Sequence, residues 1–138
     1  MHIKKELYYS IAIKDAPGAL AGITAHLMQA EVNMHGFWGF GMGRGSAQII
    51  AVPDDTEKFV QVAHDAGWQI SEGVCFRIEG QDKTGALVDI LNQISNEKIN
   101  LYAVDAIAID GNFGCYIWGE DGNAESIAQI LGLSSPLG

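Results

Sequence analysis

The chain has 138 residues, 48% of them hydrophobic, which is enough for the core of one average domain or of two small ones. Its formal net charge of −9 would repel a phosphate backbone, and this argues against nucleic-acid binding. No apolar run approaches the roughly 18 residues that span a membrane, and the first residues lack the apolar stretch of a signal peptide, so we expect a cytoplasmic protein without a membrane partner.

An alternating pattern near the start of the chain predicts the first strand. Leu7, Tyr9 and Ile11 fall on one face of a segment with a period of two residues. Asp15 and Pro17 then predict the start of a helix, because proline is tolerated in the first turn, where its missing N–H is not needed. The helix carries one apolar stripe with helical spacing, which consists of Leu20, Ile23 and Leu27.

Five glycines occur within ten residues at positions 36–45. A phosphate-binding loop needs glycines that follow a strand and open a helix, whereas the strand-like run 48–52 follows here. We therefore interpret the segment as the second strand running into a β-hairpin, with glycines that leave room for Trp38 and Phe40. Close approach of the backbone to a small ligand or to a second subunit is another use of such glycines.

The remainder of the first half predicts a third strand, a second helix and a short fourth strand. Pro53 ends the strand at 48–52, and Asp54, Asp55 and Thr56 offer capping oxygens for the helix that follows. Residues 68–70 predict the fourth strand, and Gly73 separates the two halves. The first half therefore has the predicted order strand, helix, strand, strand, helix, strand.

The second half predicts the same order with one element missing. The sequence predicts a hairpin turn at residues 110–112, where glycine and asparagine adopt positive φ easily. Residues 133–138 are too short and too interrupted by proline for a fourth strand. The second sheet therefore either lacks an edge strand or takes one from the N-terminal segment 3–7 or from a second chain. The predicted strands are 74–78, 100–109 and 114–119, and the predicted helices are 85–97 and 124–131.

No residues form a recognisable catalytic or metal-binding set. Cys75 and Cys115 lie far apart without a CxxC motif, so we interpret them as buried structural thiols. The histidines are scattered and show no HxxxH or HExxH pattern, and there is no GxSxG motif. The sequence therefore predicts no metal, no cofactor and no enzymatic activity.

One motif occurs twice in the chain. The segment Asp15-Ala-Pro-Gly-Ala-Leu20 returns as Asp82-Lys-Thr-Gly-Ala-Leu87, which is 67 positions later. Asn33, near the second strand of the first half, has its counterpart at Asn100 with the same offset. A single supersecondary unit has therefore been duplicated.

With this order of elements, the Asp-x-Pro-Gly-x-Leu motif at a strand-to-helix corner, and asparagine before an apolar residue at the second strand, the chain resembles the ACT domain. ACT domains are small ferredoxin-like modules that sense amino acids and other small metabolites. The resemblance covers nearly the whole chain as two tandem copies, which we expect at residues 1–72 and 73–138. It implies an α+β fold, a ferredoxin-like βαββαβ unit repeated twice, with antiparallel sheets and helices on one face.

The resemblance also implies where a ligand binds. In this family ligands sit between two ACT units, against the first strand-to-helix loop of one and the second strand of its neighbour. The backbone N–H groups at the open end of the helix suit a carboxylate, and an aspartate or asparagine oxygen can accept bonds from an ammonium group. The residues at these positions are Asp15, Ala16, Pro17, Gly18, Asn33 and Met34 in the first copy and Asp82, Lys83, Thr84, Gly85, Asn100 and Leu101 in the second.

Two explanations of these loop residues stay open, because each also has a structural role as a helix cap or a corner. The first is a regulatory protein that binds an amino acid between paired ACT units and does no chemistry. The alternative is a regulatory or structural subunit that docks on a metabolic enzyme without binding a ligand itself. The small and aromatic residues Tyr8, Ser10 and Ala12 on one sheet face, with the missing edge strand, predict a symmetric homodimer.

Overall fold

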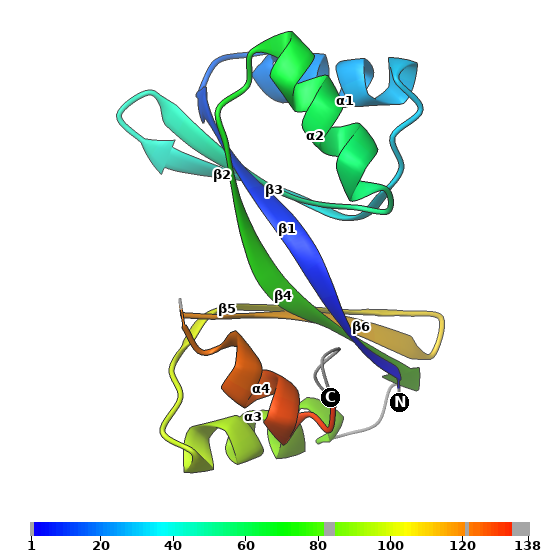
Figure 1. Ribbon diagram of the computed structural model, residues 1–138, viewed down its shortest axis with the longest axis vertical. Helices are drawn as coiled ribbons and strands as arrows, with labels where there is room; N and C mark the ends of the chain where they lie inside the picture. Colours follow the sequence, from blue (N-terminus) through cyan, green and yellow to red (C-terminus); the bar gives the residue numbers. More distant parts are fainter. Residues whose placement is uncertain (1, 82–84, 121, 134–138) are drawn as a thin grey trace. The chain divides into compact units, whose positions relative to one another are not determined.

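The computed structural model describes residues 2–81, 85–120 and 122–133 (Figure 1). No helix in these ranges is both long and apolar enough to cross a membrane. The fold is α+β, and its strands pair in antiparallel orientation. In chain order the elements are β1 His2–Lys14, α1 Ala19–Gln29, β2 Met34–Gly43, β3 Ser46–Pro53, α2 Thr56–Ala66, β4 Ile70–Gln81, α3 Ala86–Asn96, β5 Leu101–Ile109, β6 Asn112–Gly119 and α4 Ala124–Ile130.

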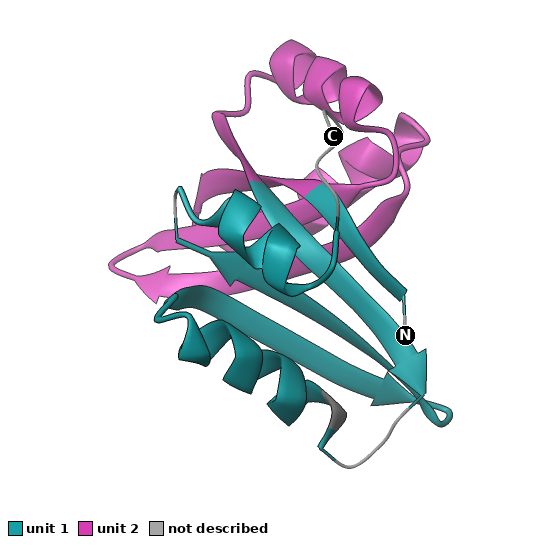
Figure 2. Cartoon of the chain, turned by 60° about the horizontal axis from the view of Figure 1, so that its bottom comes forward, with its two compact units in different colours: residues 1–6, 74–138 teal, residues 7–73 magenta. Residues whose placement is uncertain are grey.

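The chain forms two compact units, which are coloured separately in Figure 2. Unit 2 is the continuous segment Leu7–Gly73, and unit 1 combines Met1–Glu6 with Val74–Gly138. The strands β1 and β4 each contribute residues to both units. Strand β4 runs without a break through Gly73, the glycine that was expected to separate the two halves.

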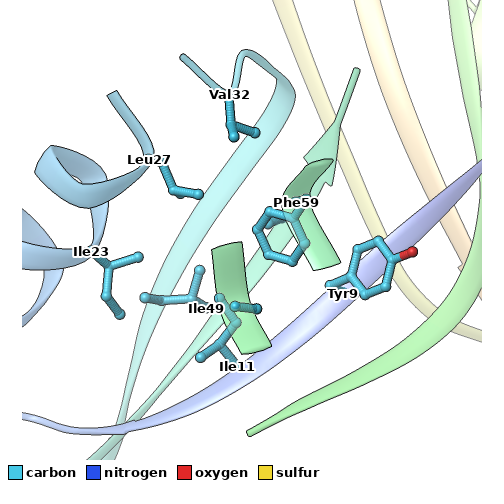
Figure 3. Close-up of a cluster of buried hydrophobic side chains, with 9 residues drawn as sticks. Tyr9, Ile11, Ile23, Leu27, Val32, Ile49 and Phe59 are labelled. Carbon is cyan, nitrogen blue, oxygen red and sulfur yellow. The ribbon is translucent and has the colours of Figure 1, made fainter. Parts of the chain in front are cut away.

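Unit 2 has the strand order β2-β3-β1, with the first residues of β4 next to β1. Ala51 of β3 pairs with Tyr9 of β1 on one side and with Phe37 of β2 on the other, and these pairs give the register of the three strands. Both helices, α1 and α2, cover one face of these strands (Figure 1). Buried side chains from the helices and the strands form the core between the two layers (Figure 3). The buried cluster consists of Tyr9, Ile11, Ile23, Leu27, Val32, Ile49, Ala51, Phe59 and Ala63.

Unit 1 has the order β5-β6-β4, with the N-terminal residues of β1 next to β4. Ile3 packs against the core of this unit, and the Lys5 ammonium lies 3.5 Å from the carboxylate of Glu125 at the start of α4. The N-terminal segment of the same chain therefore provides the fourth strand, which was one of the two sources considered from the sequence. The buried cluster consists of Phe76, Ile78, Ile90, Ile94, Cys115, Ile117, Ile127 and Ala128.

Backbone conformations recur with the same offset of 67 residues as the sequence motif. Helices α1 and α3 begin at Ala19 and Ala86 and are equally long, with 11 residues each. Left-handed residues also correspond: Gly18 (φ 87°) with Gly85 (φ 84°), and Glu31 with Lys98, both at φ 58°. The recurrence therefore extends from residue types to local geometry.

Some local predictions agree with the structure and others are wrong. Of the three residues at 54–56 that were expected to offer capping oxygens, Asp55 is the one that caps α2, because its carboxylate accepts from the Lys58 N–H. A turn does connect β5 and β6, but its positive φ angles fall on Asp110 and Gly111, whereas Asn112, which was expected to adopt one, is the first residue of β6. The prediction that Pro17 opens the first helix is wrong, because the left-handed Gly18 precedes a helix that begins at Ala19.

The apolar stripe on α1 also differs from the prediction. Ile23 and Leu27 are buried, but Leu20 is 44% exposed. Leu20 lies over Gly39, and its Cδ2 is 3.5 Å from the position of a Cβ on that glycine. It therefore covers the edge strand β2 instead of the middle of the sheet, which leaves much of its surface in water.

Candidate functional site

The predicted binding residues of the first copy begin in the loop between β1 and α1. Gly18 is the N-cap of α1, and no side chain among the described residues caps the helix there. The Asp15 N–H donates to the Gly45 carbonyl (2.9 Å), and the Ala19 N–H donates to the Ala16 carbonyl (3.1 Å). Residues 15–18 are all exposed. The positive end of α1 is therefore accessible to a ligand from solvent.

Two glycines of β2 lie beside this loop and the first turn of α1. A Cβ on Gly41 would be 3.4 Å from Oδ2 of Asp15, and one on Gly39 would contact Leu20. The glycine that leaves room for Trp38 is Gly36, because a Cβ at this position would collide with the indole ring. The glycine pattern thus serves close approach of β2 to the loop as well as space for one aromatic ring.

Asn33 and Met34 lie at the other end of α1 from this loop. Helix α1 separates them from residues 15–18, and its 11 residues span about 16 Å at 1.5 Å per residue. The Asn33 carbonyl accepts a hydrogen bond from the Asp54 N–H (3.0 Å), and Met34 pairs with Pro53 and packs against the core. Within unit 2 these two groups of predicted site residues are not brought together.

In the second copy, Asp82, Lys83 and Thr84 lie outside the described residues. Gly85 is the left-handed N-cap of α3, again without a side-chain cap from the described part of the chain. The Asn100 amide donates to Oε1 of Glu120 (3.0 Å), so its side chain has a partner within unit 1. Leu101 pairs with Gly119 and packs against the core of the unit.

A polar cluster in unit 1 was missed by the sequence analysis. Nε of Arg77 lies 3.2 Å from Oε1 of Glu6 and 3.3 Å from Oε1 of Glu79. Burial raises the pKa of the nearby Tyr116 hydroxyl, and the negative charge of Glu6 raises it further. These residues alternate with core residues along β1, β4 and β6, but nothing in the sequence shows that residue 6 lies beside residue 77. Only the pairing of β1 with β4 brings the cluster together.

The buried thiols and the buried tyrosine of unit 2 have raised pKa values. Burial raises the pKa of Cys75 to about 12 and that of Cys115 to about 11, so both remain protonated near neutral pH. The Tyr9 pKa is raised to about 12, first by burial and then by the hydrogen bond that its hydroxyl donates to Glu72 (2.7 Å). No cluster of three potential metal ligands occurs among the described residues.

No family model and no curated protein matches this sequence. Solved structures do match, with low sequence identity. Protein BT0572 from Bacteroides thetaiotaomicron superposes with a TM-score of 0.83 at 16% identity, covering 94% of this chain and 88% of that one. The ligand-free regulatory subunit of aspartate kinase from Thermus thermophilus has a TM-score of 0.66 at 12% identity, covering 95% and 93%.

The corresponding regulatory subunit from Thermus flavus gives a similar result, with a TM-score of 0.63 at 12% identity over 95% of this chain and 94% of that one. These likenesses extend along nearly the full length of each chain. They support the ACT-type fold that the sequence resemblance implies. The chain thus shares its fold with regulatory subunits of aspartate kinase.

Proposed function

We propose that this protein is a regulatory protein that binds a free amino acid at the N-terminal ends of α1 and α3. The observation that carries the proposal is the recurrence of one helix start. Gly18 and Gly85 have nearly the same positive φ, neither helix has a side-chain cap from the described residues, and a Cβ on either glycine would meet no described atom within 4 Å. At α1, where residues 15–18 are all exposed, the first N–H groups are accessible to solvent, and we propose the same for α3.

An amino acid suits this geometry at both of its charged groups. Its carboxylate would accept hydrogen bonds from the first N–H groups of the helix, where the helix dipole also favours a negative charge. At α1 its ammonium group would lie toward Asp15, whose carboxylate lies beside Gly41. Lys83 and Thr84 replace Ala16 and Pro17 of the motif in the second copy, so we propose unequal affinities at the two sites.

Asn33 would have to act on a ligand held by a different unit, because it lies at the far end of α1 from its own loop. We propose that a second copy of the chain supplies this contact in a symmetric homodimer. Light scattering is expected to show a dimer at micromolar concentration. A monomer at high micromolar concentration would contradict this arrangement.

The alternative, a subunit that docks on a metabolic enzyme, is favoured by one feature of the surface. Strands β2 and β5 carry large apolar side chains that are about half exposed or more, among them Tyr102 (65%) on β5. Two of these side chains on each strand correspond with the offset of 67 residues. They are Phe40 (49%) and Met42 (60%) on β2, and Ile107 (60%) and Ile109 (61%) on β5. Aspartate kinase regulatory subunits share the fold, so an enzyme partner is the natural occupant to test if no amino acid binds.

A thermal-shift screen of the twenty amino acids, followed by calorimetry on the hits, tests the proposal. A ligand that binds only the folded protein raises its free energy of unfolding by about 2.7 kcal/mol at a hundredfold excess over Kd. We expect one amino acid or a chemically related group to produce such a shift. If none of the twenty binds at millimolar concentration, the sensor proposal fails and the docking alternative replaces it.

A further inference from the structure

We propose a separate ligand site in unit 1, in a groove that fits a small zwitterion. The groove has a volume of about 470 Å³ and is lined by His2, Ile3, Lys4, Arg77 and Glu79. Its size lies within the range of about 300–1,000 Å³ that is typical of small-molecule pockets. It shares no residue with the loops that precede α1 and α3, and it exists only because the N-terminal segment lies next to β4.

The alternation of the two strands explains why charged residues gather here. Phe76 and Ile78 point into the core of unit 1, so Arg77 and Glu79 belong to the opposite face of β4. On β1, Lys5 reaches Glu125 at the start of α4, so Lys4 belongs to the face that carries Arg77. The helix-free face of unit 1 thus brings a lysine, an arginine and a glutamate together.

The charged side chains in the groove favour a ligand that carries both a positive and a negative charge. The Arg77 charge is balanced by the Glu6 carboxylate 3.2 Å away, whose side chain is only 8% exposed. Lys4 adds one positive charge, and Glu79, whose Oε1 also lies 3.3 Å from Nε of Arg77, adds one negative charge on a side chain that is 53% exposed. A simple anion would be repelled by Glu79 and a simple cation by Lys4. An α-amino acid would place its carboxylate toward Lys4 and Arg77 and its ammonium toward Glu79.

L-Glutamine, titrated into the ¹⁵N-labelled full-length chain, is the probe for this site. NMR separates the two kinds of site, because the groove reports at residues 3–5 and 77–80 and the loop sites report at 15–20 and 85–88. We expect glutamine to shift the first set. Two matched analogues, 4-carbamoylbutanoate without the amino group and 4-aminobutanamide without the carboxylate, are expected to bind at least tenfold more weakly.

Lys4→Gln and Glu79→Gln are each expected to weaken glutamine binding in the groove at least tenfold. Lys98→Gln and Glu97→Gln make the same charge changes at exposed positions after α3 and are expected to leave it unchanged. The proposal is overturned if glutamine shifts no groove amide at 20 mM, if either analogue binds equally well, or if the groove variants bind like the controls. Shifts confined to the loops would overturn it while supporting the proposed function. Shifts confined to the groove would support it, and the proposed function would then depend on NMR titrations of the loops with the other nineteen amino acids.

Discussion

Nε of Arg77 on β4 lies 3.2 Å from Oε1 of Glu6 on β1 and ties the N-terminal segment into unit 1. The Glu6 side chain is 8% exposed and that of Arg77 is 21% exposed, so the pair is largely shielded from water. Ion pairs in such an environment are costly to break from one side, because the remaining charge keeps its desolvation penalty. The same pair lies beside the groove proposed as a zwitterion site.

Glu6→Gln is expected to lower the free energy of unfolding by about 3 kcal/mol, which is the lower end of the range for breaking one side of a buried pair. Glu79→Gln is the matched control, since Glu79 pairs with the same nitrogen but is 53% exposed; its loss is expected to cost less than about 1 kcal/mol. Urea denaturation of both variants measures the difference. Equal losses would show that the Glu6 pair is not a buried one.

Truncating core side chains tests the packing of each unit. Leu27 is 3% exposed and Ile94 is 1% exposed, in the cores of unit 2 and unit 1. Leu27→Ala and Ile94→Ala are each expected to destabilise the protein by about 2–5 kcal/mol, from lost burial and the cavity left behind. Leu20→Ala, at a side chain that is 44% exposed, is expected to cost less than half as much. If both substitutions lowered the free energy of unfolding by less than about 0.5 kcal/mol, the placement of these two side chains in the cores would be wrong.

The glycines that precede α1 and α3 are expected to be intolerant of side chains for conformational reasons. Gly18 has φ 87° and Gly85 has φ 84°, and a Cβ at either position would meet no described atom within 4 Å. Gly18→Ala and Gly85→Ala are therefore expected to cost about 1–2 kcal/mol of unfolding free energy from backbone strain alone. Gly22→Ala is the control, because Gly22 lies in α1 without positive φ, and there alanine is expected to stabilise the helix by up to about 1 kcal/mol. Equal effects of all three changes in thermal denaturation would contradict the strain argument.

The buried tyrosine of unit 2 predicts a loss of stability in alkali. The folded pKa of Tyr9 is about 12 against an ordinary value of 10.0, because burial and the bond to Glu72 favour the neutral hydroxyl. Since the folded pKa is the higher one, this stabilisation is complete below pH 10 and is lost as the pH rises from 10 toward 12. Denaturation from pH 8 to 11 is expected to show a decline that is smaller in Tyr9→Phe. Tyr102→Phe, at a side chain that is 65% exposed, is expected to decline like the wild type. The same slope in all three proteins would rule out the role of Tyr9.

Local patterns were enough to predict much of this protein. Alternation with a period of two marks β1, turn residues mark the hairpin at 110–112, and Asp55 marks the start of α2. The motif shared by residues 15–20 and 82–87 predicted a duplicated unit, and the helix starts recur with the same offset in the structure. Each of these features depends on interactions between residues that are close in sequence, so the residue types themselves carry the information.

Contacts between distant residues were decided by the tertiary structure. The strand missing from the second half made residues 3–7 one of two possible donors, but only the structure shows that residues 2–6 of β1 join unit 1, because a strand obtains its hydrogen-bond partners from other strands. The helical spacing of α1 places Leu20 on the same stripe as Leu27 but does not say that a glycine of the edge strand lies beneath it. The resemblance likewise assigns Asp15 and Asn33 to the binding residues of the first copy, whereas in the structure they lie at opposite ends of α1. Sequence determines which face an element buries, and only the packing of elements determines what that face meets.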